Sequence, residues 1–509
     1  MTVSRIRTLN DRPAHHSGQY VVYWMTSARR LGWNFGLQRA VDLALEHRRP
    51  LVILEALRCD YPGANDRLHR FVIDGMASNA REASRTRARY YPYIEPAIGH
   101  GSKLLATLAV DACVVVTDWY PAFFLPRMAT AAARQVDVRL EAVDSNGLIP
   151  LAAHGREFTA ARFYRAFVQR TLRDYVLDVP EIAPLRRLAK GPRLRSLPSS
   201  VKTNWPAASD RLLRNPTRAL ADLPIDHSIA PVAARGGTRA ARRALYDFIG
   251  AKLSRYAMDR NHPDADGTSR LSPYLHFGHL SAHEVFAAVM TRERWTTRRL
   301  GKRGGGVREG WWGVSPSADA FLDQLVVWRE LAFNACEYNP DHANYDSLPQ
   351  WARATLAEHR ADPRPYLYDL DALESARTHD VVWNAAQRQL VAEGWFHGYL
   401  RMLWGKRILE WSPDAETALE RMRSLMDRYA LDGRDPNSYA GYMWVLGRYD
   451  RPWPERPIFG TVRAMTSESA LRKLRIKAFL AKWRELDSDS TQTRLRLNSD
   501  NVNNPRDRK

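Results

Sequence analysis

The sequence predicts an α/β domain followed by an all-helical domain, and three observations lead to this fold class. Short apolar runs alternate with segments of helical period in the first third of the chain. A stretch rich in Pro, Ser and Arg follows, and helical periodicity then dominates. A chain of 509 residues is also long enough for two or more cores. We therefore expect an α/β domain at 1–185, a long linker at 186–236, a helical domain at 237–486 and a disordered tail at 487–509.

The first domain is predicted to contain a parallel, Rossmann-like sheet. Helical segments such as 36–48 and 67–83 separate its apolar runs, which indicates a parallel sheet covered on both faces. No GxGxxG motif follows the first strand, so dinucleotide binding of the usual kind is not supported. The predicted strands are YVVYWM (20–25), PLVILEAL (50–57), RYYPYIEP (89–96), CVVVTDW (113–119) and VRLEAV (138–143).

The second domain is predicted to be helical from the apolar periodicity of segments such as 239–256 and 318–338. A basic, Gly-rich loop at 292–310 interrupts this pattern. Of the 16 tryptophans in the chain, 12 lie from Trp295 onward, and four of these fall within 383–411. Such a concentration is compatible with core packing, with an aromatic path for electrons or with a platform for bases. Composition does not decide among the three.

The charge balance favours a polyanionic partner. The formal net charge is +20 with a pI near 10, and nucleic acid is the first expectation, with a basic surface that has no partner as the alternative. The three cysteines lie far apart and form no CxxC, which argues against a zinc site or a disulfide framework. No run approaches the length of a signal peptide or a membrane span. We expect a cytoplasmic protein without a metal or a membrane contact.

Two segments of the helical domain have side chains suited to binding a charged group. In TSRLSPYLHFGHLS (268–281), hydroxyl and backbone N–H groups at a helix start can hold phosphate, although an ordinary helix N-cap gives the same pattern. In VVWRELAFN (326–334), Glu330 has apolar neighbours one helical turn away, so burial is expected to raise its pKa. A glutamate that reaches solvent is the alternative.

A third segment places polar side chains in a turn before a tryptophan. In LDGRDPNSYAGYMW (431–444), Asp432, Asp435 and Asn437 lie in a turn with Gly and Pro that leads to Trp444. Carboxylates, amides and backbone groups at close range suit the polar edge of a flavin. A polar surface loop is the alternative.

A fourth segment interleaves cations with an aromatic residue. DRPWPERPIFGTVRAM (450–465) contains Arg451, Trp453, Arg456 and Arg463 in a Pro-rich stretch. Phosphate contacts combined with base stacking need this mixture of side chains. A structural basic loop is the alternative.

Six segments, in this order, carry a resemblance to a known family. They are TSRLSPYLHFG, WREL, WNAAQ, RMLWGKRILEW, LDGRDPN and WPERPIFGTVR. Through them the chain resembles the class II cyclobutane pyrimidine dimer photolyases of the photolyase/cryptochrome superfamily, from about Arg5 to Phe479. Each segment is short, and their joint occurrence makes the resemblance specific.

The resemblance implies an antenna-type α/β domain and a helical domain that folds around FAD. Members of the family bind double-stranded DNA that contains a pyrimidine dimer and flip the dimer out of the duplex in the dark. Blue light then excites the reduced flavin, which passes an electron to the dimer, and the electron returns after the cyclobutane ring has split. The reaction involves no net redox change and no metal.

The resemblance also implies which residues surround the flavin. Arg401 and Asp432 match a salt bridge beside the isoalloxazine, and Asn437 is expected in the same turn. The residues that match the segment holding the FAD phosphates are Tyr256, Thr268, Ser269, Arg270, Leu271 and Ser272.

Other matches concern electron transfer and DNA. Glu330 matches a glutamate that hydrogen-bonds the dimer and steadies its radical anion. Trp404 and Trp383 match a pair that relays electrons from the surface to photoreduce oxidised flavin, and Trp411 matches a third, nearby tryptophan; Trp395 is assigned to packing. The residues that match positions at the lesion or in the DNA bubble are Arg260, Met402, Trp444, Arg451, Trp453 and Arg463.

The sequence departs from the family pattern at three places. Met426 precedes the Asp-Arg-Tyr triplet 427–429, where an asparagine usually faces the central ring of the flavin. A thioether cannot replace the hydrogen bond of an amide, so Asn437 or water would have to compensate. Trp328 stands where an arginine is usual, and the 292–310 loop resembles an insertion.

The expected function is light-driven repair of cyclobutane pyrimidine dimers, the activity of a deoxyribodipyrimidine photo-lyase. The alternative is a cryptochrome-like flavin photoreceptor without repair activity, which Met426 favours and the DNA-facing residues oppose. A monomer with FAD is expected, with an association to the nucleoid if the source is bacterial. The α/β domain fits a second antenna chromophore, either a folate or a deazaflavin, and also fits none.

Overall fold

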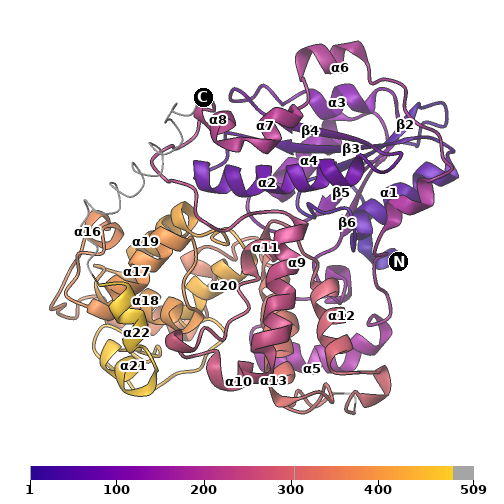
Figure 1. Cartoon of the computed structure of the whole chain (residues 1–509). Helices are drawn as coiled ribbons and strands as arrows, with labels where there is room; N and C mark the ends of the chain where they lie inside the picture. Colours follow the sequence, from indigo (N-terminus) through magenta and orange to yellow (C-terminus); the bar gives the residue numbers. More distant parts are fainter. Residues whose placement is uncertain (1, 303, 485–509) are drawn as a thin grey trace, which may run out of the picture.

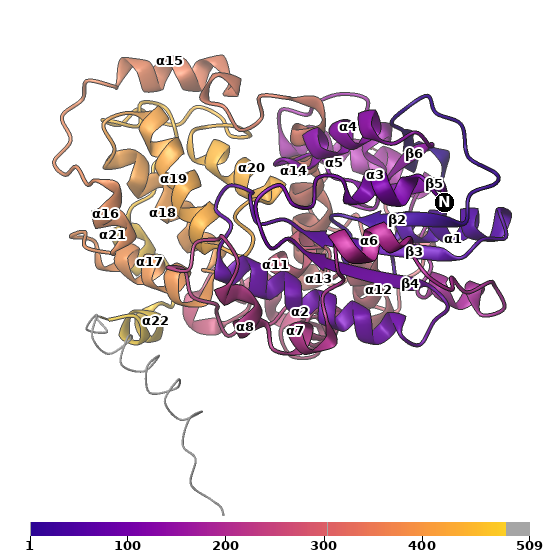
Figure 2. The ribbon, with the colours of Figure 1, turned by 90° about the horizontal axis from the view of Figure 1, so that it is seen from above.

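The computed structural model describes residues 2–302 and 304–484, so the predicted tail at 487–509 lies outside the described residues. The sheet and its covering helices form one side of the molecule, and the orange and yellow helices of the C-terminal part gather on the other side (Figure 1). A view turned by 90° shows the same separation (Figure 2). The predicted order of an α/β part followed by a helical part is therefore confirmed.

A single mixed sheet of six strands forms the centre of the first part, in the order β1-β6-β5-β2-β3-β4. All neighbouring strands are parallel except β1, which pairs antiparallel with β6. The strands are β1 Ile6–Thr8, β2 Tyr20–Met25, β3 Leu51–Leu57, β4 Arg89–Ile94, β5 Ala112–Trp119 and β6 Leu140–Asp144. The sequence predicted the last five; the three residues of β1 are too few to show a period.

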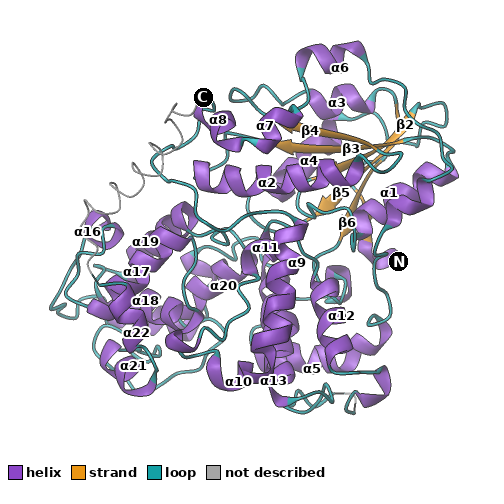
Figure 3. Ribbon diagram, viewed as in Figure 1, coloured by secondary structure: helices purple, strands orange, loops and turns teal. Residues whose placement is uncertain are grey.

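Helices cover both faces of this sheet. In Figure 3, α3 and α6 lie above the orange strands and α2 lies below them. Alternating residues of one strand enter different cores: Val22 of β2 packs in the core that includes α3 and α6, and Tyr23 packs in the core that includes α1. All six residues of β2 are buried. The α-helices up to the linker are α1 Phe35–Glu46, α2 Asp66–Ala83, α3 Leu104–Ala109, α4 Leu125–Gln135 and α5 Ala161–Thr171.

The segment between the two parts contains short helices, α6 Ser199–Asn204, α7 Asp210–Arg214 and α8 Pro216–Ala221. Helices α7 and α8 both contact α2. Helix α5 packs in the same core as α9, α12 and α13 of the helical part. The domain limits at residues 185 and 236 remain predictions.

The helical part contains two cores. One core includes residues of α14 and of α17 to α22, and the other includes residues of α5, α9, α12 and α13. The α-helices here are α9 Thr238–Asp247, α10 Tyr256–Asp259, α11 Ser272–His276, α12 Ala282–Arg292, α13 Pro316–Leu322, α14 Arg329–Tyr338, α15 Gln350–Glu358, α16 Leu370–Glu374, α17 Val381–Glu393, α18 Gly398–Glu410, α19 Ala415–Tyr429, α20 Pro436–Val445, α21 Ser467–Lys473 and α22 Lys477–Lys482.

Two π-helical segments interrupt the α-helices, η5 Phe248–Lys252 and η9 Asp323–Trp328. The 3₁₀ helices are η1 Val3–Arg5, η2 Leu151–Ala153, η3 Leu172–Asp174, η4 Pro184–Leu188, η6 Leu253–Arg255, η7 Pro263–Ala265, η8 Thr297–Arg299 and η10 Tyr345–Ser347. In η9 only Gln324 and Trp328 are partly exposed.

The basic loop is held in place by tryptophans. Trp311 Nε1 donates to the Lys302 carbonyl oxygen at 3.0 Å, and Trp295 Nε1 donates to the Trp312 carbonyl oxygen at 2.7 Å. Trp311 and Trp312 are each 4% exposed, so core packing accounts for this part of the tryptophan concentration. Across residues 2–302 and 304–484, no helix is both long and apolar enough to span a membrane, and no cluster of His, Cys, Asp and Glu is suited to a metal ion.

Candidate active site

An ion pair between the partly buried Arg401 and the buried Asp432 joins helix α18 to the turn before α20. Arg401 Nη2 lies 2.7 Å from Asp432 Oδ1, and the two side chains are 17% and 5% exposed. The Ser438 hydroxyl donates to the Asp432 carbonyl oxygen at 2.7 Å, which fixes the turn from the other side. The Arg401 guanidinium also lies 5.2 Å from the centre of the Phe396 ring. The pair is therefore a fixed polar group in an apolar surrounding.

The rest of this turn is held by Asp435, which caps the N-terminus of α20. Asp435 Oδ1 accepts from the backbone N–H of Asn437 at 2.9 Å and from its side-chain amide at 2.7 Å. Burial alone would raise the pKa of Asp435, but its hydrogen bond with His276 and nearby positive charges outweigh burial and hold the pKa at about 2. One of the two side-chain N–H groups of Asn437 is thus used within the turn.

Met426 lies against the same turn. Its side chain is fully buried on α19, and Gly433 is so close to the Met426 carbonyl group that a Cβ atom would not fit. The next residue, Asp427, has a buried Oδ1 without a hydrogen-bond partner among the described residues. Burial raises the pKa of Asp427 to about 6. The Met426 backbone therefore lies against the turn that contains Asp432, and the expected position of its side chain at the flavin stays a prediction.

The predicted phosphate segment precedes helix α11. Thr268 Oγ1 is buried and has no hydrogen-bond partner among the described residues. Arg270 adopts φ 53°, and its guanidinium lies 4.5 Å from the centre of the Trp395 ring and 3.1 Å from Asp266. Trp395, which the sequence assigns to packing, thus covers Arg270. Both ring nitrogens of His397 are also buried without a partner in the described chain.

Residues on either side of this segment complete its surroundings. Tyr256 opens helix α10 and is 8% exposed, and the Arg260 guanidinium lies 5.7 Å from its ring centre. Leu271 is 1% exposed. Ser272 is the first residue of α11, and Ser269 Oγ accepts from the backbone N–H of Leu271 at 3.4 Å.

Three tryptophans form a continuous buried line from this region. The rings of Trp404 and Trp383 are parallel within 3°, with centres 6.2 Å apart, and Trp411 lies 5.6 Å from Trp383. Trp383 Nε1 donates to the Trp404 carbonyl oxygen at 3.0 Å, and Trp404 Nε1 donates to Gln387 at 2.9 Å. Trp404 follows Arg401 by three residues on α18, so both lie on one side of the helix.

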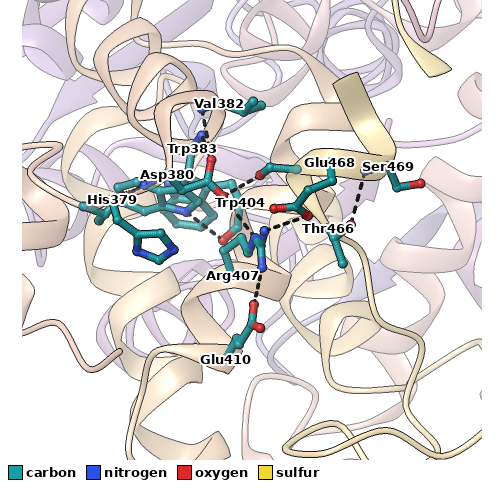
Figure 4. Close-up of polar contacts among 12 residues, drawn as sticks. His379, Asp380, Val382, Trp383, Trp404, Arg407, Glu410, Thr466, Glu468 and Ser469 are labelled. Atoms are coloured by element: carbon teal, nitrogen blue, oxygen red, sulfur yellow. Dashed lines mark hydrogen bonds and ion pairs between the residues drawn. The ribbon is translucent and has the colours of Figure 1, made fainter. Parts of the chain in front are cut away.

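Acidic side chains surround Arg407, which lies close to the outer end of this line (Figure 4). The Arg407 guanidinium lies 5.7 Å from the centre of the Trp411 ring and pairs with Asp380 at 3.1 Å, Glu410 at 2.6 Å and Glu468 at 3.4 Å. Three carboxylates outnumber one guanidinium. The acidic groups therefore favour a positive charge at Trp411.

A second aromatic group, partly exposed, lies on α20 and the loop after it. The Arg463 guanidinium lies 4.0 Å from the Trp453 ring centre and 5.7 Å from that of Trp444. Asp450 pairs with Arg463 at 2.7 Å, while Arg451 lies 5.5 Å from the Trp453 ring centre. This arrangement presents indole faces and guanidinium groups together on one surface.

Helix α18 connects this surface with the buried region. A Cβ placed on Gly441 of α20 would lie 3.6 Å from Met402 Cε, so Met402 faces α20. Lys406, one turn further along α18, is buried, and its Nζ lies 5.0 Å from the Trp444 ring centre. Sequence reasoning did not single out Lys406. Burial lowers its pKa to about 7.

Glu330 does not join either group in the structure. Its carboxylate accepts from the backbone N–H of Leu148 at 2.8 Å and of Ile149 at 3.4 Å, and Gly147 leaves no room for a Cβ beside it. The side chain is 1% exposed, and burial raises its pKa to about 7. The buried carboxylate predicted from the sequence is present, and its hydrogen bonds tie α14 to the segment after β6.

A separate cavity of about 300 Å³ lies between the sheet and helix α11. Residues that follow the carboxyl ends of the parallel strands line it, including Thr26 after β2, Arg58 after β3 and Glu95 after β4. Tyr61 and Phe124 contribute aromatic walls. Strands β2 and β5 are neighbours in the sheet. After β2 the chain continues to β3 and β4 on one side, and after β5 it continues to β6 on the other side. Ligands of α/β proteins bind at such a topological switch point.

No protein-family model matches the chain. A deoxyribodipyrimidine photo-lyase of Methanothermobacter thermautotrophicus is 35% identical over 95% of this chain and 98% of its own length. The structure is similar to a class III photolyase from Agrobacterium tumefaciens, with a TM-score of 0.63, 15% identity and coverage of 92% of this chain and 86% of that chain. An archaeal photolyase from Sulfolobus tokodaii with two FAD molecules gives a TM-score of 0.60, 16% identity and coverage of 91% and 90%.

The identity to the archaeal relative extends through both parts of the chain, and the solved structures share the arrangement of sheet and helices. The resemblance inferred from six short segments is thereby confirmed at the level of the superfamily. The chain therefore belongs to the photolyase family of the photolyase/cryptochrome superfamily.

Proposed function

We propose that the chain binds FAD and repairs cyclobutane pyrimidine dimers in double-stranded DNA with blue light, as a class II enzyme. One observation carries the proposal: a line of three buried tryptophans begins one helical turn from the buried Arg401–Asp432 ion pair. Core packing alone requires neither the parallel stacking of Trp404 and Trp383 nor a charge pair at the inner end of their line.

The residues around the ion pair fit FAD. Thr268 Oγ1, Asp427 Oδ1 and the ring nitrogens of His397 are buried polar atoms without partners among the described residues, and such atoms are normally satisfied. A ligand with phosphate and ring hydrogen-bonding groups would satisfy them. We assign the phosphates to Tyr256 and to the segment from Thr268 to Ser272, and the flavin ring to Arg401, Asp432, Met426 and Asn437.

When bound and reduced, FAD supplies the light-excited electron for opening the cyclobutane ring. The Arg401 guanidinium, fixed by Asp432, places positive charge beside the site of the flavin and favours its anionic form. The buried surroundings exclude water from the electron path. Trp404, Trp383 and Trp411 restore the reduced cofactor when it has become oxidised.

We assign DNA binding to the partly exposed aromatic surface. Arg260 and Met402 are assigned to the lesion, Trp444 and Trp453 to stacking within the opened duplex, and Arg451 and Arg463 to phosphate. Indole stacking and cation contacts of this kind bind unpaired nucleic acid. Glu330 is not assigned to the lesion, because its carboxylate is bound by the backbone N–H groups of Leu148 and Ile149.

The cavity at the carboxyl ends of the strands suits a second chromophore. Its volume of about 300 Å³, aromatic walls and charged residues such as Arg58 and Glu95 fit a flat ring with polar substituents. The Sulfolobus photolyase of similar fold holds two FAD molecules. We propose an antenna pigment in this cavity, and a folate and a deazaflavin both remain candidates.

A cryptochrome-like photoreceptor is the second candidate function, and Met426 is the observation that favours it. A fully buried thioether beside the flavin site gives no hydrogen bond to the flavin. The test is repair of a duplex that contains a single dimer, by holoprotein whose flavin has been chemically reduced. Light-dependent restoration of the pyrimidines supports repair; tight flavin binding without restoration supports the photoreceptor.

A further inference from the structure

The line of tryptophans does not reach solvent by itself. Trp383, Trp404 and Trp411 are 0%, 1% and 2% exposed. An electron taken from Trp411 leaves an oxidised ring in the interior, from which the charge readily recombines. A residue that connects Trp411 to solvent is therefore needed if the proposed photoreduction is to last.

Tyr368 and His379 occupy this position. The Tyr368 ring centre lies 5.4 Å from that of Trp411, and that of His379 lies 5.3 Å from it. The backbone N–H of Tyr368 donates to the Trp411 carbonyl oxygen at 3.3 Å, which holds the two residues together. Both contact the tryptophan at the end of the line, which Trp383 separates from Trp404.

The hydrogen bonds of Tyr368 define the direction of its proton. The Tyr368 hydroxyl lies 2.8 Å from His379 Nδ1, and the backbone N–H of His379 donates to the same hydroxyl oxygen at 3.0 Å. The hydroxyl donates to Nδ1 in the imidazole tautomer that carries its proton on Nε2. Figure 4 shows His379 next to Asp380 at the start of α17. His379 is exposed, so a proton that it accepts can pass to water.

A second tyrosine covers this pair. The Tyr366 ring is stacked on His379 with the centres 3.7 Å apart, and Tyr366 is 48% exposed. No hydrogen bond of the Tyr366 hydroxyl is found among the described residues. Tyr366 thus resembles Tyr368 in residue type and place but lacks the proton acceptor.

We propose that Tyr368 is the terminal electron donor of the chain and that His379 accepts its proton. The proposal rests on the tryptophan path proposed above. After the path has withdrawn one electron from Trp411, Tyr368 gives one electron to the Trp411 radical cation and its hydroxyl proton to His379 Nδ1. The products are neutral Trp411, a neutral Tyr368 radical and an imidazolium. An external thiol then reduces the tyrosyl radical by one electron, and His379 or water returns the proton.

Loss of the proton makes the step useful. A tyrosine is difficult to oxidise if its hydroxyl proton stays in place, because the product is a strongly acidic radical cation. Transfer of the proton along the 2.8 Å hydrogen bond to His379 yields a neutral radical instead. The acidic groups near Trp411 hold a positive charge by Coulomb attraction, but they do not attract a neutral radical. After proton transfer the oxidised residue is a neutral Tyr368 radical, and the positive charge lies on His379.

The test uses holoprotein with oxidised FAD and follows radicals by transient absorption and by electron paramagnetic resonance. The unchanged protein is expected to form a tryptophan radical first and a neutral tyrosyl radical second, with the second step slower in D2O. Tyr368→Phe should remove the tyrosyl signal and lower the yield of lasting photoreduction severalfold. His379→Phe keeps the aromatic stack and Tyr368 itself, so an equal loss in this variant assigns the proton acceptor.

Tyr366→Phe is the matched control and should leave the tyrosyl signal unchanged. The proposal is overturned if the unchanged protein forms no tyrosyl radical, if the signal survives in Tyr368→Phe, or if His379→Phe retains normal yield. Trp404→Phe separates the two proposals. If photoreduction continues without Trp404, the path itself is wrong; if it stops without Trp404 but not without Tyr368, only the terminal step is wrong.

Discussion

Two groups of tryptophans in the helical part have opposite surroundings. Trp383, Trp404 and Trp411 are at most 2% exposed, and their indole N–H groups or rings contact other buried groups. Trp444 and Trp453 are partly exposed, and the Arg463 guanidinium lies 4.0 Å from the Trp453 ring centre. Residue type is therefore a weak guide to function here, and burial together with charged neighbours separates the two groups.

The difference suits the two roles that we propose for these groups. Electron transfer between rings benefits from closely spaced, rigid, water-free contacts, which the inner group provides. Binding of DNA needs ring faces that solvent can reach and cations that neutralise phosphate, which the outer group provides. A substitution in the inner group should therefore leave DNA binding unchanged, and a substitution in the outer group should leave photoreduction unchanged. Experiments on single variants can test this expectation.

The largest expected effect is loss of photoreduction in Trp404→Phe. Phenylalanine fills most of the buried space but is much harder to oxidise, so oxidised FAD should no longer be reduced by light. Repair by chemically reduced enzyme and the affinity for DNA should persist. Trp395→Phe is the matched control, because Trp395 lies in the same stretch but stacks on Arg270 outside the line. Normal photoreduction in Trp404→Phe would mean that the inner group serves core packing and not electron transfer.

The next largest effect is expected for the buried carboxylate of Glu330. Burial raises its pKa to about 7, so from about pH 4.5 to pH 7 the unfolded chain is ionised while the folded protein keeps the proton. Stability contributed by the protonated form is lost as pH rises through this range, by about 3 kcal/mol. Urea unfolding at pH 5 and pH 8 should show this loss in the unchanged protein and not in Glu330→Gln. An equal pH dependence in both would place the titration elsewhere.

Glu330 also shows how far the sequence could lead. Its apolar neighbours at helical spacing correctly predict a buried carboxylate, because periodicity is a local property. Its partners are the backbone N–H groups of Leu148 and Ile149, which are about 180 residues away and carry no side-chain signal. The expected contact with the lesion came from a short motif, which carries no information on these backbone partners, and it stays a prediction.

The remaining elements follow the same rule. The five longer strands and most helices were predictable from their period, whereas β1 and the short helices α6 to α8 were not, because a few residues show no period. Arg401 and Asp432 were paired by resemblance, and the structure places them 2.7 Å apart. Lys406, Tyr368 and His379 were missed, since their interest arises only from burial or from contacts across the chain.

The outer group should respond to Trp453→Ala with a loss of preference for damaged DNA. The indole is expected to fill the space left by the flipped dimer, so its removal should cost about 1–3 kcal/mol of the difference in binding between damaged and intact duplex. Competition binding with both duplexes measures this difference. Light-driven reduction of FAD should be unaffected; a change in photoreduction rather than in preference would contradict the division into two groups.

Arginine substitutions should sharpen the description of the outer surface. Arg451→Ala should lower the slope of log affinity against log salt by about one, as expected for one lost phosphate contact. Arg463 is paired with Asp450 at 2.7 Å, so its phosphate contact must compete with the carboxylate and Arg463→Ala should change the slope less. Asp450→Asn releases Arg463 and should raise affinity. Equal slopes in all four proteins would remove this loop from the DNA contact.

The smallest effect concerns Met426, which lies near the inner group but outside the electron path. If a hydrogen bond to the central ring of the flavin is missing, Met426→Asn should supply it and lengthen the lifetime of reduced FAD in air. The gain expected from one such bond is about 0.5–1.5 kcal/mol, and a packing gap left by the shorter side chain would offset part of it. Reoxidation after photoreduction, measured at one oxygen concentration, compares the two proteins.

Met426→Leu is the control that keeps an apolar side chain. The Asn437 amide donates one N–H to Asp435 at 2.7 Å and has a second N–H, so Asn437→Ala tests whether this group contacts the flavin instead. Faster reoxidation in Asn437→Ala, with no gain in Met426→Asn, would show that Asn437 has taken over the contact.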